Sequence, residues 1–131
     1  MMFLFDTNII SELFRRQPNL GVVAFSQQVK RIYLSVISIE EIAFGLSAKP
    51  IPQLSKRFES FVAAQCIVLP ISADIARQCG EMRGQLRTRG ISRTQADMLI
   101  AATAKCHQLT LVTRNVRDFE LCDISIVNPF T

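Results

Sequence analysis

The chain has 131 residues, 49% of them hydrophobic and 20% charged, and this size and balance predict one globular domain over residues 1–131. Fifteen basic and 11 acidic residues give a net charge of +4, which fits a polyanionic partner and equally a solvated basic surface. With no bilayer-length apolar run, no signal-peptide pattern and no C-x-x-C pair, the sequence disfavours a membrane partner, a disulfide scaffold and a zinc site, and we expect a cytoplasmic protein.

Short apolar runs alternate with helical patterns along the chain. In order, we expect a strand over 2–5, helices over 8–15 and 20–30, a strand over 32–36, helices over 38–46 and 51–64, a strand over 66–69, helices over 73–89 and 94–106, and strands over 110–113 and 125–127. This alternation predicts an α/β fold, a three-layer α/β/α sandwich with a central parallel sheet of about five strands. Such sheets bind ligands beyond the carboxyl ends of their strands, where the strand order reverses.

Four acidic residues stand near strand ends or helix starts. Asp6 follows the first strand in FLFDTNII, and Glu41 lies one turn into the helix that follows the second strand in LSVISIEEIAFG. Asp97 is in the first turn of SRTQADMLIAATA, and Asp118 follows the fourth strand in LVTRNVRDFE. Because parallel strands end at one edge of a sheet, the geometry could bring Asp6, Glu41 and Asp118 to one crevice.

Each acid also has a purely structural interpretation. The segments Ser38–Glu41 and Thr94–Asp97 fit the capping box, in which an acid at the third helical position reaches back to the cap residue. Asp6 fits the N-cap of the first helix, and Asp118 fits a turn.

Capping leaves the position of Asp97 on its helix unexplained. The residues three, four and seven positions further on are Ile100, Ala101 and Ala104, so this carboxylate lies along the stripe that packs inward and needs a compensating partner. Carboxylates that converge in one crevice repel one another unless a cation holds them ionised. Oxygen ligands favour Mg²⁺, with Mn²⁺ as a substitute, and 11 of the basic residues are arginines, which suit phosphate contacts, so a nuclease fits the pattern.

The four acidic segments, in this order, resemble the motifs of the PIN-domain ribonucleases, and more narrowly of the VapC-type toxins of bacterial type II toxin–antitoxin systems. FLFDTNII is similar to the first motif, SVISIEEIAFG to the second, ISRTQADMLIAATA to the third and LVTRNVRDFE to the fourth, while the closing IVNPF resembles the usual family terminus. The resemblance runs nearly end to end and implies a PIN-like fold and a Mg²⁺-dependent endoribonuclease.

The resemblance also implies roles for individual residues. It assigns metal-binding and catalytic roles to Asp6, Glu41 and Asp97, with Asp118 as a candidate fourth acid. Many relatives carry an acid at the position of Asn115, so the last ligand is Asp118, a water held by Asn115, or neither. The resemblance also implies that Asn8, Thr113 and Asn115 support the site by orienting the carboxylates or a bound water.

The implied reaction is RNA cleavage by an activated water, leaving a 5′-phosphate and a 3′-hydroxyl. Candidates for RNA contact are Arg83, Arg87, Arg89, Arg114 and Arg117, with a solvated helix face as the alternative for the first three. The resemblance further implies a homodimer and a cognate antitoxin that places an arginine among the carboxylates. The aromatic residues on the helices that the family uses for antitoxin contact are Phe25, Phe58 and Phe61, for which core packing is the alternative.

The sequence also bears on three other function classes. A receiver-type signalling domain needs an acidic pair after the first strand, and this chain has Asp6 alone there, so that class is disfavoured. A non-catalytic RNA- or protein-binding module on the same fold stays open, as does a solitary RNA-processing nuclease without an antitoxin. An RNA cleavage assay distinguishes the binding module from a nuclease. An antitoxin reading frame upstream distinguishes a toxin from the solitary nuclease.

Overall fold

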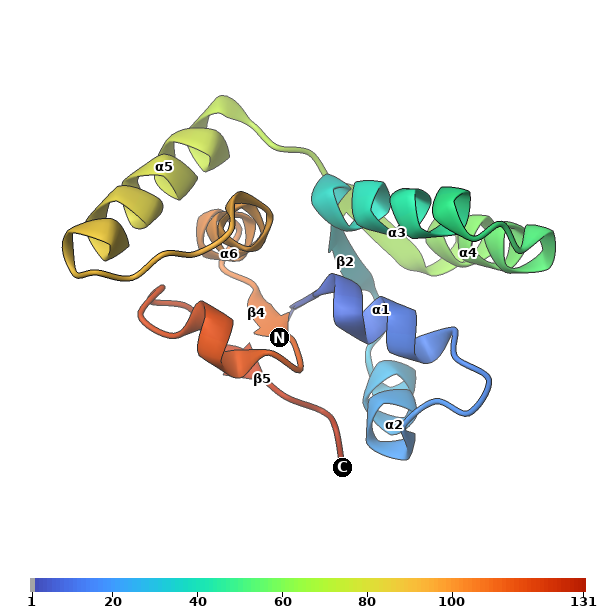
Figure 1. The fold of residues 1–131 in the computed structure, drawn as a ribbon. Helices are drawn as coiled ribbons and strands as arrows, with labels where there is room; N and C mark the ends of the chain where they lie inside the picture. The colour runs from blue at the N-terminus through green and yellow to red at the C-terminus, as the bar shows by residue number, and fades with distance from the viewer. Residues whose placement is uncertain (1) are drawn as a thin grey trace.

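The computed structural model describes residues 2–131, and its centre is a five-stranded parallel sheet (Figure 1). The strands are β1 (Phe3–Phe5), β2 (Ile32–Ser35), β3 (Cys66–Leu69), β4 (Thr110–Val112) and β5 (Ile126–Val127). Their order across the sheet is β3-β2-β1-β4-β5, so β1 lies in the middle and pairs with both β2 and β4. The parallel sheet and the α/β class predicted from the sequence are confirmed.

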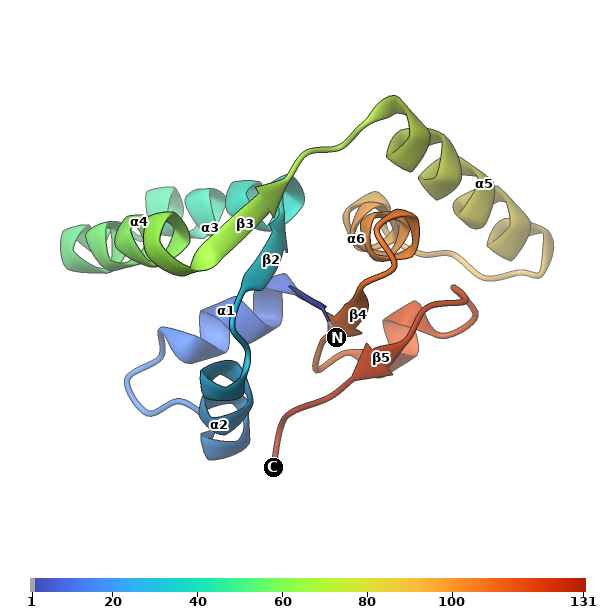
Figure 2. The ribbon, with the colours of Figure 1, turned by 180° about the vertical axis from the view of Figure 1, so that it is seen from behind.

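Helices cover both faces of this sheet (Figures 1 and 2). Towards one face lie α1 (Thr7–Leu13), α2 (Leu20–Gln28), α3 (Val36–Ala48) and α4 (Pro52–Gln65), and on the other lie α5 (Ala73–Thr88) and α6 (Gln95–Cys106). A short 3₁₀ helix, η1 (Val116–Phe119), follows β4. Within residues 2–131, no helix is long and apolar enough to span a bilayer.

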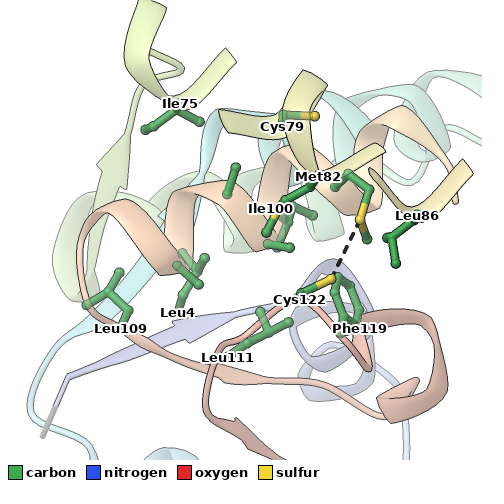
Figure 3. Packing of buried hydrophobic residues seen from close by; sticks show 14 residues of the cluster. Leu4, Ile75, Cys79, Met82, Leu86, Ile100, Leu109, Leu111, Phe119 and Cys122 are labelled. Carbon is green, nitrogen blue, oxygen red and sulfur yellow. Dashed lines mark hydrogen bonds between the residues drawn. The ribbon is translucent and has the colours of Figure 1, made fainter. Parts of the chain in front are cut away.

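The sheet separates two hydrophobic cores because successive strand residues point to opposite faces. Leu4 and Leu111 pack beneath α5 and α6, together with Ile100 and Phe119 (Figure 3). On the opposite face Phe5 and its neighbours pack against α1, α2 and α4. With both faces of β1 and β4 buried, the carboxyl ends of these strands are fixed from both sides.

The start of α3 differs from the prediction. Ser35, the last residue of β2, caps the helix by accepting a 3.0 Å hydrogen bond from the Ile37 amide, so the helix begins at Val36. The capping box expected over Ser38–Glu41 is therefore wrong, because the helix starts directly at the end of the strand. Ser38 is buried inside the first turn instead.

The predicted cap at Asp6 and the Thr94 half of the predicted capping box are confirmed. Asp6 caps α1, with Oδ1 accepting a 2.8 Å hydrogen bond from the Thr7 amide, and the Thr94 hydroxyl accepts a 3.2 Å hydrogen bond from the Asp97 amide at the start of α6. Both acids thus stand at helix N-termini, where the helix dipole favours negative charge.

Candidate active site

A cleft of about 440 Å³ opens beyond the carboxyl ends of β1 and β4. The strand order reverses between these two strands, which is where open α/β sheets bind their ligands. Asp6 from the end of β1, Glu41 from α3 and Asp97 from α6 all line this cleft. The structure therefore brings together three of the four predicted acids.

Asp6 is the most deeply buried of these acids, with 4% of its surface exposed. Its Oδ2 accepts hydrogen bonds from the Thr113 hydroxyl at 2.8 Å and from the Asn8 side-chain amide at 3.2 Å. Burial raises the pKa of Asp6 to about 6; the hydrogen bonds from Thr113 and Thr7 oppose this, and the negative charges of Asp97 and Glu41 add to it. Asp6 is thus a precisely held carboxylate that forms no ion pair within residues 2–131.

Thr113 and Asn8 connect Asp6 to the loop that follows β4. The Thr113 hydroxyl accepts hydrogen bonds from the Asn115 amide at 3.0 Å and from the Asn8 side chain at 3.3 Å. The Asn8 side-chain oxygen in turn accepts a 3.2 Å hydrogen bond from the Arg114 amide. This network fixes the backbone of the loop relative to the carboxylate.

Thr7 orients the carboxylate of Glu41, as Thr113 and Asn8 orient that of Asp6. Its hydroxyl lies 2.6 Å from Glu41 Oε1, as the donor, and 2.8 Å from the Ser38 hydroxyl. Thr7 was not predicted as a site residue. Its position in the sequence, between Asp6 and Asn8, could have indicated this role, because the first residues after a central strand all face the same crevice.

Asp97 is half-buried at the N-terminus of α6. Ile100, Ala101 and Ala104 are all buried, as the predicted inward stripe requires. The pKa of Asp97 is raised, mainly by burial and further by the negative charges of Asp118 and Glu41. The hydrogen bond with Thr94 and the positive charge of Arg93 oppose this rise. Asp6, Glu41 and Asp97 therefore influence one another electrostatically.

The two candidates for the fourth ligand are placed differently. Asn115 lines the cleft, whereas Asp118 lies on η1, exposed and outside the cleft lining. Asp118 reaches the site only through its charge, which acts on Asp97.

The donor atoms of the cleft suit a hard divalent cation. Within residues 2–131, no three Asp, Glu, His or Cys side chains are already grouped as metal ligands. Nevertheless, the cleft carries four carboxylates, the three predicted ones and that of Glu12, beside Asn8 and Asn115, which is an all-oxygen set of the kind that Mg²⁺ and Mn²⁺ prefer. The raised pKa values of Asp6 and Asp97 identify negative charge that a cation would compensate.

Two arginines line the cleft, and only one of them was predicted. Arg114 was a candidate from the sequence, while Arg15 was missed; it also pairs with Glu12 at 3.3 Å. The intervals between Asn8, Glu12 and Arg15 match one helix face and could have revealed it. The remaining candidates are exposed and lie outside the cleft lining: Arg83 and Arg87 on α5, Arg89 directly after it, and Arg117 on η1.

An apolar groove of about 340 Å³ adjoins the cleft between α1, α3 and α4. The two share Ser11, Arg15 and Glu41, and the groove continues over Ile42 and Leu54. Phe58 lies at its base as part of the core. The other two aromatic candidates, Phe25 and Phe61, are partly buried and pack against the same core.

Comparison with known proteins places this geometry in context. Residues 3–124 match the family model of the PIN domain. The chain is 34% identical over 137 aligned positions to VapC ribonuclease Y4jK of Sinorhizobium fredii, covering 98% of each protein. It is 36% identical to Toxin FitB of Neisseria gonorrhoeae, covering 98% of the chain and 99% of the relative. A toxin–antitoxin complex from Klebsiella pneumoniae contains a chain of similar structure, with a TM-score of 0.76, 28% identity and 97% coverage of both chains.

Proposed function

Because the chain belongs to the PIN-domain family, we propose that it is a Mg²⁺-dependent endoribonuclease and the toxin of a toxin–antitoxin pair. The observation that carries this proposal is the meeting of Asp6, Glu41 and Asp97 in one cleft at the reversal of strand order. A VapC ribonuclease and a toxin among the relatives support it. The protein would act on RNA in the cytoplasm.

Asp6, Glu41 and Asp97 would hold Mg²⁺, or Mn²⁺ as its substitute. When bound, the cation activates a water and stabilises the charge that develops on the scissile phosphate. The protein's own contribution is to orient the ligands: Thr113 and Asn8 fix Oδ2 of Asp6, and Thr7 fixes Oε1 of Glu41. These hydroxyls and amides keep the carboxylates from rotating away from one another.

Asn115 is better placed than Asp118 to complete the site. Asn115 lines the cleft, where its side-chain amide would be able to hold a water or a phosphate oxygen. The charge of Asp118 makes ionisation of Asp97 harder in the metal-free protein. We therefore assign Asn115 a binding role and Asp118 an electrostatic one.

The apolar groove supports the proposal of an antitoxin partner. A partner segment with apolar side chains followed by an arginine would fill the groove and then reach the carboxylates, because Glu41 borders both. Such a segment would block the site that binds the cation and the RNA. A homodimer remains part of this proposal, and the exposed Phe44 on α3, 70% accessible, is a candidate for burial in an interface.

The test of the activity is cleavage of a structured RNA by the purified protein in Mg²⁺. We expect products with a 5′-phosphate and a 3′-hydroxyl, and loss of cleavage in EDTA and in Asp6→Asn and Asp97→Asn. Asp74→Asn is the matched control, since Asp74 is exposed on α5 and pairs only with Arg77. Cleavage that survives EDTA and both cleft variants would contradict the metal mechanism, and a wild type that cuts no RNA would favour a binding module.

The toxin role needs a separate test. We expect a short reading frame upstream whose product, when co-expressed, copurifies with this chain and suppresses cleavage. If no such frame exists and expression of the wild type is harmless, a solitary RNA-processing nuclease becomes the better assignment.

A further inference from the structure

The last four residues, Asn128 to Thr131, form a segment that is docked beside the acidic cleft. Asn19, the N-cap of α2, donates a 3.0 Å hydrogen bond from Nδ2 to the Thr131 carbonyl and accepts a 3.2 Å hydrogen bond at Oδ1 from the Thr131 amide. The same Oδ1 accepts the Gly21 amide at 3.0 Å. One side chain thus both starts a helix and anchors the C-terminal segment.

Docking of this segment makes Phe130 part of the cleft wall. Its ring centroid lies 4.5 Å from Cζ of Arg114, which is within the range of a cation–π contact. In the described part of the chain the ion pairs are Arg15–Glu12, Arg77–Asp74 and Lys105–Asp123. Arg114 is in none of them, so an aromatic ring and not a carboxylate holds its guanidinium.

Arg114 is also fixed at its backbone. Its amide donates to the Asn8 side-chain oxygen at 3.2 Å, and the Asn8 amide group donates to Asp6 Oδ2. The guanidinium therefore has a defined place relative to the buried carboxylate: Asn8 sets the position of its backbone, and Phe130 sets the direction of its side chain.

We propose that the C-terminal segment is part of the RNA-binding site, with Phe130 as a positioning residue that holds the Arg114 guanidinium for contact with an RNA phosphate. This inference rests on the proposed ribonuclease function. Arginine binds a phosphate best through two parallel hydrogen bonds, which require the guanidinium plane to be oriented. A guanidinium already ordered by stacking loses less freedom when RNA binds, so Phe130 acts through affinity and not through the chemical step.

Gly21 offers a way to displace the segment without changing a residue of the cleft. A Cβ on Gly21 would clash with the Pro129 carbonyl oxygen and would lie 2.5 Å from Cγ2 of Thr131. Gly21→Ala is therefore incompatible with the docked segment. Gly80→Ala is the matched control, because Gly80 is in α5 and a Cβ there meets nothing within 4 Å.

The experiment compares five single variants of the full chain, Phe130→Leu, Phe130→Tyr, Arg114→Gln, Gly21→Ala and Gly80→Ala, and the double variant of Phe130→Leu with Arg114→Gln. Steady-state cleavage of a single-stranded RNA gives kcat and KM. Binding of the same RNA to each variant in an Asp97→Asn background, measured across salt concentrations, gives the affinity and its salt dependence. Thermal unfolding by circular dichroism verifies that each variant is folded.

We expect Phe130→Leu and Gly21→Ala to raise KM about tenfold with little change in kcat, the loss expected for one charged hydrogen bond. The slope of log affinity against log salt should fall by about 0.7, the value for one phosphate contact on a single strand. Arg114→Gln should give the same result, and Phe130→Leu should add little to it in the double variant. Phe130→Tyr should restore wild-type KM because it keeps the ring, and Gly80→Ala should match the wild type.

The inference is overturned if Phe130→Leu keeps the wild-type KM and salt slope, or if Phe130→Tyr is as impaired as Phe130→Leu. An unaltered salt slope in Arg114→Gln overturns it as well. If Gly21→Ala does not fold, the Leu and Tyr pair at position 130 decides the question. A wild type that neither binds nor cuts RNA is a different result, since it refutes the proposed function itself and this inference with it.

Discussion

The Thr113 hydroxyl donates a 2.8 Å hydrogen bond to Oδ2 of Asp6, joining the residues that directly follow two adjacent strands of the sheet. Thr113 is fully buried and also accepts the Asn115 amide, so its hydrogen can point only towards the carboxylate. A neutral side chain thereby fixes the orientation of the most buried acid in the cleft.

Replacing this hydroxyl tests its role. We expect Thr113→Val to lower RNA cleavage about 10- to 100-fold at limiting Mg²⁺, because residues that orient metal ligands have effects of that size. Thr113→Ser keeps the hydroxyl and should retain most of the activity. The measurement is cleavage rate against Mg²⁺ concentration, and equal curves for Thr113→Val and the wild type would contradict the assignment.

The pKa of Asp6 predicts how stability depends on pH. Since burial raises this pKa from 3.8 to about 6, the folded state binds the proton more tightly than the unfolded state, and the free energy of unfolding falls as pH rises from about 4 to about 6. The penalty above pH 6 is at most about 3 kcal/mol. Asp6→Asn removes the titrating group, so its stability relative to the wild type should increase across this range.

Urea unfolding in EDTA at several pH values measures this difference. Asp74→Asn serves as the control, because it removes an exposed carboxylate on α5, outside the cleft lining. A difference between Asp6→Asn and the wild type that does not change between pH 4 and 7 would show that Asp6 is not strained by burial.

The unequal placement of Asn115 and Asp118 leads to another prediction. Asp118→Asn should change cleavage by less than about threefold, since Asp118 is exposed and acts only through its charge. Asn115→Asp should lower the Mg²⁺ concentration needed for half-maximal cleavage, because it adds a further carboxylate to the cleft. Both are read from the same Mg²⁺ titration. If Asp118→Asn is as inactive as Asp97→Asn, then Asp118 is a ligand after all.

The sequence was sufficient for the fold and for the acids at the strand ends. A short apolar run predicted β3 at Cys66–Leu69, and the helical spacing of apolar residues predicted the end of α6 at Cys106. Both were predictable because these signals are local. The start of α3 was not predictable in this way. Two serines, Ser35 and Ser38, each precede helix-compatible residues, and only the paired end of β2 decides that Ser35 is the cap.

The parts of the site that the sequence missed depend on tertiary contacts. Phe130 reaches the cleft because Thr131 binds Asn19, which lies 112 residues earlier, and no local pattern encodes that contact. For the RNA-contact candidates on α5, Arg83 and Arg87, the sequence shows the charge but not its place in the fold. The helix α5 packs against α6, on the face of the sheet opposite to α1 (Figure 2). Its residues are not part of the cleft lining.

The most direct test of the account is a Mn²⁺ titration followed by electron paramagnetic resonance, which detects the free ion. The account predicts that the wild type and Asp74→Asn bind Mn²⁺ with equal affinity, that Mg²⁺ competes, and that Asp6→Asn and Asp97→Asn each weaken binding at least about tenfold. Wild-type Mn²⁺ affinity in both cleft variants would contradict the claim that these carboxylates hold the cation.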